Sequence, residues 1–288
     1  MKQVRFKRHN PRMHWVGDGF PVRSVFSYTD IAAEISPFLM MDYASPTRFP
    51  PTEERKGVGE HPHRGFETVT IVYEGEVEHR DSAGGGGTIG QDEVQWMTAA
   101  SGLVHEEFHG RDYAKTGGLF EMIQLWVNLP ARLKMSSPAY QGITRETIPA
   151  VDLPGNSGKV RVIAGEFQGI RGPASTHTPI DLWDIRIDKT TRFSSRVPEG
   201  HTAALFVLNG SVRFQDGHQA TDAELVVLDP SGTELEFETD GPAKLLFLGG
   251  EPLHEPIVGY GPFVMNTPEE IQQAFLDYRS GKMGRFQN

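Results

Sequence analysis

FETVTIVYEG at residues 66–75 is the stretch that decides the fold class. Its β-branched and aromatic residues form a short run that ends at Gly75, a pattern typical of a strand followed by a turn. Similar runs follow along the chain: VRVIAG at 160–165, DLWDIRID at 181–188, TAALFVLNGSVRF at 202–214 and AKLLFLGG at 243–250. The 32 glycines and 20 prolines mark turns between such runs. The sequence therefore predicts an all-β protein, either a sandwich or a barrel.

The chain contains a faint internal repeat. IVYEG ends at Gly75 and FVLNG ends at Gly210, an offset of 210 − 75 = 135 residues. GQDEVQWMTAASG and ATDAELVVLDPSG match at an offset of 130, with Asp92 opposite Asp222. The polar, proline-bearing segment ARLKMSSPAYQG at 131–142 is the most plausible connection between the copies. We therefore predict two similar β domains in tandem, at residues 1–140 and 141–288.

One helix is expected near the C-terminus. Thr267 can cap it, Pro268 suits its first turn, and Glu270 completes a T-x-x-E capping box. Gly281 provides a stop signal. The sequence thus predicts one amphipathic helix that packs against a β domain.

Composition excludes several classes of function. The net charge of −10, without a clustered basic face, argues against direct binding to nucleic acid. Apolar runs are far shorter than the roughly 20 residues of a membrane-spanning helix, so no membrane association is expected. The N-terminal MKQVRFKRHNPRMHW has no apolar stretch behind its basic residues and does not read as a secretory signal, which favours a cytoplasmic protein. Because cysteine is absent, any metal site must use nitrogen and oxygen ligands.

Two residue pairs have the spacing of metal ligands. His61 and His63 are separated by one residue, so on an extended strand both imidazoles project to the same face. His105 and Glu107 repeat this spacing at the end of another predicted strand. Neutral imidazoles with one carboxylate suit Fe(II), Mn(II), Ni(II), Cu(II) or Zn(II), and four such ligands leave positions open on a six-coordinate ion. The pattern favours a catalytic metal over a structural one.

The second copy of the repeat lacks all four candidate ligands. At the matching offsets the four positions hold Arg196, Pro198, Leu235 and Phe237. Residues needed only for packing would have no reason to disappear as a set, whereas ligands of one ion would. This loss strengthens the metal interpretation and restricts it to the N-terminal copy.

Glu67 is an alternative carboxylate. It lies at even spacing from His61 and His63 and faces the same side if the strand continues without a bulge through Gly65. Glu67 is therefore either a ligand itself or a partner that orients a ligating imidazole and takes part in catalysis.

HEEFH at 105–109 matches the H-E-x-x-H motif of zinc proteases, but that motif requires a helix. The segment lies between Gly102 and Gly110 in a strand-like context, which argues against a protease. The remaining histidines, including His79, have no partner at ligand spacing and are interpreted as surface or ordinary hydrogen-bonded residues.

Four segments together resemble the pirin family of the cupin superfamily: HPHRGFETVTIVYEG at 61–75, DEVQWMTAASGLVHEE at 92–107, LWVNLP at 125–130 and GEPLHEPIVGYGPFVMNTPEEIQQA at 250–274. The resemblance spans most of the chain. It implies two tandem jelly-roll-like cupin β-barrels with a C-terminal α-helix, and one metal, usually iron, in the N-terminal barrel only. The family's ligands match His61, His63, His105 and Glu107, which favours Glu107 over Glu67 as the carboxylate ligand.

The resemblance implies two different classes of function. Bacterial pirins are associated with quercetin 2,3-dioxygenase activity, which opens the central ring of a flavonol with O2 and releases CO. Animal pirins are described as iron-binding, redox-sensitive regulators that bind a protein partner. We expect a dioxygenase acting on a small flavonol-like aromatic substrate with Fe(II), in which Glu107 or Glu67 accepts the proton of the substrate hydroxyl. The alternative is a non-catalytic regulator.

Overall fold

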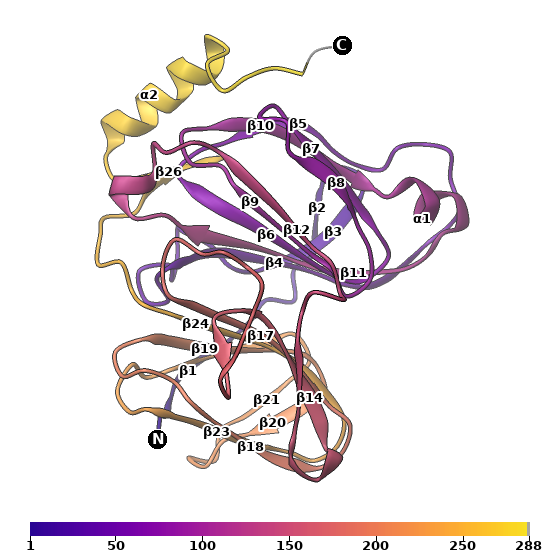
Figure 1. The fold of residues 1–288 in the computed structure, drawn as a ribbon, viewed down its shortest axis with the longest axis vertical. Coiled ribbons are helices and arrows are strands. Elements are labelled where there is room, and N and C mark those ends of the chain that lie inside the picture. Colours follow the sequence, from indigo (N-terminus) through magenta and orange to yellow (C-terminus); the bar gives the residue numbers. More distant parts are fainter. Residues whose placement is uncertain (287–288) are drawn as a thin grey trace. The chain divides into compact units, whose positions relative to one another are not determined.

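The computed structural model describes residues 1–286 and confirms a mostly β protein (Figure 1). Its contacts divide the chain into two compact units. Unit 1 comprises Met1–Pro11, Glu34–Pro37 and Glu146–Leu253, and unit 2 comprises Arg12–Ala33, Phe38–Arg145 and the segment that begins at His254. The predicted contiguous domains, 1–140 and 141–288, differ from these units at both ends. The reason is long-range strand pairing, since the first strand of the chain pairs with a strand of the C-terminal half.

Unit 2 is built from two antiparallel sheets, one of seven strands and one of four. The larger sheet has the order β12 (Ala139–Ile143), β9 (Val94–Thr98), β6 (Phe66–Glu74), β11 (Gly118–Asn128), β4 (Phe38–Phe49), β3 (Phe20–Phe26) and β2 (His14–Val16). The smaller sheet has the order β5 (Gly57–His63), β10 (Leu103–His109), β7 (Val77–Asp81) and β8 (Gly86–Ile89). Unit 2 also contains a short helix, α1 (Arg111–Thr116). A separate hairpin is formed by β25 (Val258–Tyr260) and β26 (Phe263–Met265).

Unit 1 repeats this plan with a seven-stranded and a four-stranded sheet. Its larger sheet has the order β1 (Val4–His9), β22 (Glu224–Leu228), β19 (Thr202–Asn209), β24 (Ala243–Gly250), β17 (Ile180–Ile187), β14 (Gly158–Ala164) and β13 (Ala150–Asp152). Its smaller sheet has the order β18 (Thr191–Arg196), β23 (Glu234–Thr239), β20 (Ser211–Arg213) and β21 (Gln219–Thr221), and β15 (Glu166–Phe167) pairs with β16 (Ile170–Arg171). The shared plan accounts for the repeat seen in the sequence.

The interiors of the two units differ in polarity. Unit 1 has one large apolar core, in which Leu235 and Phe237 are fully buried on β23. In unit 2 an apolar cluster that includes Phe20 and Phe120 fills only part of the interior. The rest holds buried polar side chains, among them His105 on β10, although burying polar groups costs free energy unless they find partners. The candidate ligands therefore lie in unit 2, whereas the matching positions of unit 1 hold the buried apolar Leu235 and Phe237 and the exposed Arg196 and Pro198.

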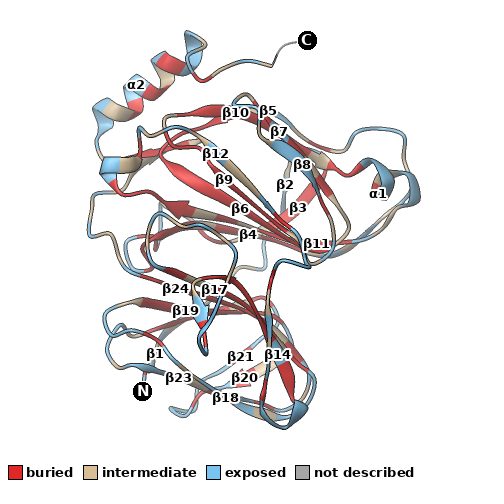
Figure 2. Ribbon diagram, in the orientation of Figure 1, coloured by how far each residue is buried: buried red, intermediate tan, exposed pale blue. Residues whose placement is uncertain are grey.

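The C-terminal helix begins and ends where the sequence predicts. Helix α2 spans Pro268–Arg279, with the reciprocal capping box between Thr267 and Glu270 and with Gly281 at φ 80° beyond its end. Its buried residues include Ile271 and Ala274, which face the β26 side, and its opposite face is exposed (Figure 2). The amphipathic spacing thus docks this helix onto unit 2. No helix within residues 1–286 is both long and apolar enough to cross a membrane.

A buried ion pair ties α2 to the β5–β6 connection. Arg64 Nη1 donates to Asp277 Oδ2 at 3.0 Å, and Asp277 Oδ1 accepts from Lys282 and Gln273. The hydrogen bond from Lys282, supported by those from Gln273 and Arg64, lowers the pKa of Asp277 to about 2 against the opposing effect of burial. Because the carboxylate is the form that binds, this contribution to the docking of α2 is made only while Asp277 is ionised, in addition to the apolar contacts of Ile271 and Ala274.

We expect this anchor to fail in acid. A carboxyl whose pKa is lower in the folded than in the unfolded state adds stability above its unfolded value of 3.8, and that stability is lost as the pH falls towards 2. Urea unfolding at pH 7 should show wild type more stable than Asp277→Asn by on the order of 1–2 kcal/mol, and the difference should shrink between pH 4 and pH 2. A difference that stays constant over this range would contradict the assignment.

Candidate metal centre

Strands β5 and β10 position the candidate ligands. In the antiparallel register His105 lies opposite His61, and Leu103 lies opposite His63. The register then shifts, so that Glu107 lies opposite Val58, because β5 bulges between these positions. A bulge of this kind redirects the side chains next to it. The predicted i, i+2 pairs therefore do lie on neighbouring strands, as the metal hypothesis requires.

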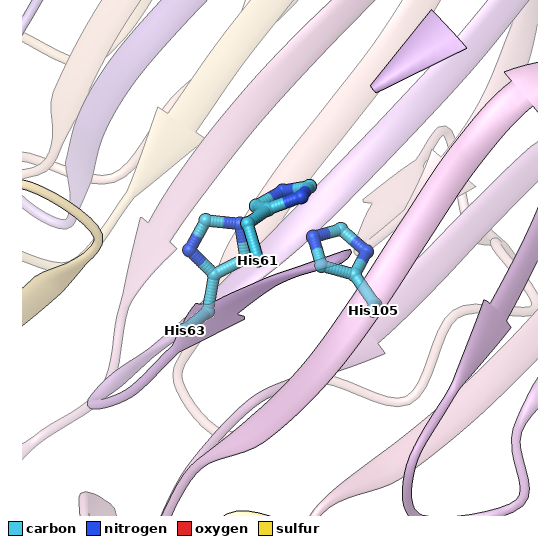
Figure 3. Close-up of side chains that lie close together, drawn as sticks. All are labelled: His61, His63 and His105. Atoms are coloured by element: carbon cyan, nitrogen blue, oxygen red, sulfur yellow. The ribbon is translucent and has the colours of Figure 1, made fainter. Parts of the chain in front are cut away.

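Three imidazoles converge on one point. Figure 3 shows His61 and His63 from β5 and His105 from β10 turning their rings toward a common space. The ring centroids lie 4.9 Å apart for His61 and His63, 4.2 Å for His61 and His105, and 4.8 Å for His63 and His105. One nitrogen from each ring falls within a group whose members all lie within 4.8 Å of one another. This arrangement can place three nitrogen ligands around one ion.

The outward nitrogens of two rings are held by backbone carbonyls. Nδ1 of His61 lies 2.8 Å from the Gly59 carbonyl oxygen, and Nδ1 of His63 lies 3.3 Å from that of Pro262. A carbonyl only accepts, so each Nδ1 carries the proton and each Nε2 keeps its lone pair. Such outer contacts orient metal-ligating histidines.

His105 provides the test of whether these residues fit a metal. Its Nε2 is buried and, within residues 1–286, has no hydrogen-bond partner. A buried polar atom without a partner costs free energy, and a metal ion at this point would satisfy it. Burial, together with the neighbouring imidazoles, lowers the pKa of both His63 and His105 well below the usual value, so both are neutral near pH 7. The residues present fit a divalent transition-metal ion.

Glu107 lies at the edge of this cluster rather than inside it. A carboxylate oxygen of Glu107 lies within 4.8 Å of ligand nitrogens of His105 and His79. It does not belong to the group formed by His61, His63 and His105. Oε1 accepts hydrogen bonds from Gln95 Nε2 at 2.9 Å and Thr70 Oγ1 at 3.4 Å. Both hydrogen bonds go to the same oxygen, which leaves Oε2 as the oxygen that could reach an ion.

The structure does not bring Glu67 to the imidazoles. The chain leaves the four-stranded sheet after His63, turns at Gly65 (φ 92°), and enters the seven-stranded sheet at β6. The premise of one continuous strand therefore fails, and the parity argument for Glu67 fails with it. On β6, Glu67 and Thr70 are three residues apart, so their side chains face opposite sides of the sheet, and Thr70 is on the side of Glu107. Glu67 lies opposite Thr98, whose hydroxyl donates to it at 2.7 Å. Its carboxyl thus points to the other face of the sheet, where burial raises its pKa to about 7.

His79 is the site residue that sequence reasoning missed. It lies on β7, fully buried, with its Nδ1 3.3 Å from Nδ1 of His105 and its Nε2 3.3 Å from Asp81 Oδ2. His79 is thus hydrogen-bonded, as one of the two predicted alternatives has it, but the sequence did not indicate that it lies beside His105. The available signal was the H-x-D spacing of His79 and Asp81, which is the same i, i+2 pattern used for the candidate ligands.

Aromatic rings form a wall beside the candidate ligands. Phe66 and Trp126 stack with centroids 4.2 Å apart, and both rings approach His63, at 5.1 and 5.2 Å. Tyr28 stacks on Trp126 in turn. Trp126 and His61 are only partly buried, so each is in part accessible to solvent. A flat aromatic surface next to three imidazoles suits an aromatic ligand.

Comparisons with known proteins agree with the fold and cover the whole chain. The Pirin family profile matches residues 19–127, and the profile for the Pirin C-terminal cupin domain matches residues 182–284. A Pseudomonas aeruginosa protein that bears the provisional name quercetin 2,3-dioxygenase is 52% identical over 285 residues, which is 99% of both chains. A pirin-like protein of Solanum lycopersicum is 36% identical over 93% of this chain and 88% of its own.

A solved structure supports the same assignment. The crystal structure of a quercetin 2,3-dioxygenase from Acinetobacter baumannii superposes with a TM-score of 0.97 at 49% identity and covers 100% of both chains. Pirin profiles match both halves of the sequence, and a pirin-like relative aligns over nearly its whole length. This chain therefore belongs to the pirin family, whose members carry two cupin domains.

Proposed function

We propose that this protein is a metal-dependent dioxygenase that opens the central ring of flavonols such as quercetin with O2 and releases CO. The observation that carries the proposal is the convergence of three imidazoles beside the stacked Phe66 and Trp126. Two relatives that align over essentially the whole chain, at 52% and 49% identity, bear the name quercetin 2,3-dioxygenase, the first provisionally.

The proposed metal ligands are His61, His63, His105 and Glu107. Iron(II) is the proposed ion, since imidazole and carboxylate ligands with open positions suit it, although Mn, Ni, Cu and Zn accept similar sets. A bound ion would act as a Lewis acid toward a hydroxyl oxygen of the substrate and would supply the redox chemistry that O2 requires.

The remaining chemistry belongs to side chains of this chain. Phe66 and Trp126 would hold the flat flavonol beside the imidazoles, which sets its orientation and keeps water from its face. Glu107 would accept the proton of the substrate's 3-hydroxyl, and the hydrogen bond from Gln95 to its Oε1 would hold the carboxylate in place. Glu67 has no role in this proposal, because it lies on the other face of β6.

The test is O2 consumption by anaerobically prepared, Fe(II)-loaded protein on addition of quercetin. We expect one O2 to be consumed and one CO released for each quercetin lost. A variant carrying His61→Ala and His63→Ala should lose bound iron and lower the rate by more than about 100-fold, because it removes two ligands. A matched variant, His9→Ala with His218→Ala, changes two histidines outside the site and should keep the wild-type rate.

Two results would contradict the proposal. If wild type holds iron but consumes no O2 with quercetin, this reaction is wrong, and the non-catalytic regulator with a protein partner becomes the better hypothesis. If wild type and the His61→Ala, His63→Ala variant bind iron equally, the metal centre itself is wrong.

A further inference from the structure

A chain of buried polar groups runs outward from His105. Nδ1 of His105 lies 3.3 Å from Nδ1 of His79, and Nε2 of His79 lies 3.3 Å from Asp81 Oδ2. The register allows this contact, because β10 and β7 place His105 opposite Asp81 and Glu107 opposite His79, so that His79 is a diagonal neighbour of His105. The side chains of His79 and Asp81 are at most 1% exposed. Because water does not reach these side chains, each of the two contacts, His105–His79 and His79–Asp81, must contain one proton that one partner donates to the other.

The carboxylate of Asp81 sets the direction of the chain. Burial raises the pKa of Asp81, but hydrogen bonds from His79 and from the amides of Gly85 and Ala83 outweigh it and keep the pKa low. An ionised carboxylate only accepts hydrogen bonds, so His79 must donate from Nε2. A neutral His79 protonated at Nε2 presents a bare lone pair at Nδ1.

A second contact favours the same tautomer of His79. The amide nitrogen of Gln95 donates to Glu107 Oε1 at 2.9 Å, which fixes the orientation of that amide. The same nitrogen lies 3.5 Å from His79 Nδ1. An amide nitrogen only donates, so an N–H at His79 Nδ1 would face another donor. The two hydrogens of this amide have closer acceptors in Glu107 Oε1 and, at 3.2 Å, Thr70 Oγ1, but its nitrogen still disfavours an N–H at Nδ1 of His79.

We propose that Asp81 and His79 are positioning residues that force His105 to carry its proton on Nδ1 and thereby keep its Nε2 lone pair aimed at the metal. Because His79 accepts at Nδ1, His105 donates from Nδ1, and its Nε2 is the buried nitrogen that has no partner among the described residues 1–286. Figure 3 shows this ring facing His61 and His63. This inference rests on the proposed metal centre. It explains why His79 and Asp81, which are not among the proposed ligands, are buried next to it.

Asp81→Asn should reverse the chain with almost no change in shape. Asp81 Oδ1 accepts from the backbone N–H groups of Ala83 and Gly85 at 2.8 and 2.9 Å, so the asparagine oxygen takes that place and its NH2 group faces His79. His79 must then accept at Nε2 and carry its proton on Nδ1. That proton confronts Nδ1–H of His105, which drives the His105 proton to Nε2 and removes the lone pair that binds the metal.

The experiment combines metal affinity with a direct measurement of the tautomers. Chelator competition with Ni(II) should show affinity reduced by about 10- to 100-fold in Asp81→Asn, the range for residues that orient a ligand. Asp112→Asn, the same substitution at an exposed residue of α1, is the matched control and should bind as wild type. In metal-free protein labelled with 15N-histidine, long-range 1H–15N spectra should show His79 as the Nε2–H tautomer and His105 as the Nδ1–H tautomer, with both reversed in Asp81→Asn.

Three outcomes separate this inference from the proposed function. Wild-type His79 found as the Nδ1–H tautomer would overturn the inference, whether or not the variant folds. Equal Ni(II) affinity in wild type and Asp81→Asn would also overturn it while leaving the metal centre in place. Wild type that binds Ni(II) no better than the His61→Ala, His63→Ala variant would overturn both.

Discussion

His105→Gln is expected to reduce metal affinity by more than about 100-fold and to abolish quercetin-dependent O2 consumption. His105 is common to both ligand groups, since one contains His61 and His63 and the other contains His79 and Glu107. The substitution therefore removes a candidate nitrogen ligand from both groups at once. Replacement of a residue that only orients a ligand costs about 10- to 100-fold, so loss of this shared ligand should cost more. Isothermal titration with Ni(II) and O2 electrode traces provide the measurements.

The matched control lies four residues further along the same strand. His109 on β10 is also buried, but its Nε2 donates to the Gly19 carbonyl at 2.8 Å and its ring stacks on Phe120, away from the site. His109→Gln should lower thermal stability and leave metal affinity unchanged. If the two variants bind Ni(II) equally well, His105 is not a ligand.

Lys134→Met is expected to lower the free energy of unfolding by about 3–5 kcal/mol. The amine of Lys134 is buried and donates to three oxygens: the Gly65 carbonyl at 2.7 Å, Asn128 Oδ1 at 2.6 Å and the Val264 carbonyl at 3.0 Å. Burial lowers the pKa of this lysine to about 7, yet its three acceptors match the three N–H donors of an ammonium group. Methionine has nearly the same length but removes the hydrogen bond that Lys134 donates to each of the three oxygens.

This lysine also stabilises the turn that carries the chain from His63 into β6. A Cβ at Gly65 would lie 2.0 Å from the Val264 carbonyl oxygen, so the two backbone segments touch here, and Lys134 bonds to both. Urea unfolding followed by tryptophan fluorescence measures the loss of stability. Lys115→Met, at an exposed lysine of α1, should change stability by less than about 0.5 kcal/mol. A similar small effect for Lys134→Met would show that the buried hydrogen bonds contribute little.

The features that the sequence predicted correctly depend on local geometry. Side chains alternate along a strand with a period of two, so His61 and His63 had to share a face. Thr267 and Glu270 stand at the spacing that closes a capping box, and α2 begins there. The internal repeat predicted the same strand plan twice because the two copies keep the same order of strands and turns. Each of these features is determined by interactions between residues that are close together in the sequence.

The features that it missed depend on contacts between distant segments. Glu67 was placed on the wrong face because the chain changes sheets at Gly65, a turn that exists only where Val264 and Lys134 pack against it. The units are discontinuous because β1 completes the sheet of unit 1 by pairing with β22. Neither fact leaves a local signal in the residues concerned.

His79 illustrates the division between the two sources of information. The sequence by itself determined an all-β chain, the two i, i+2 pairs of candidate ligands and the capped helix, because alternation and capping act over a few residues. Only the tertiary structure decided that β7 lies against β10 in the register that brings His79 to His105, and that the polar interior belongs to one unit. The register is set by long-range strand pairing and by the burial of whole sheet faces, which depend on the packed interior of the unit and not on the neighbours of any one residue.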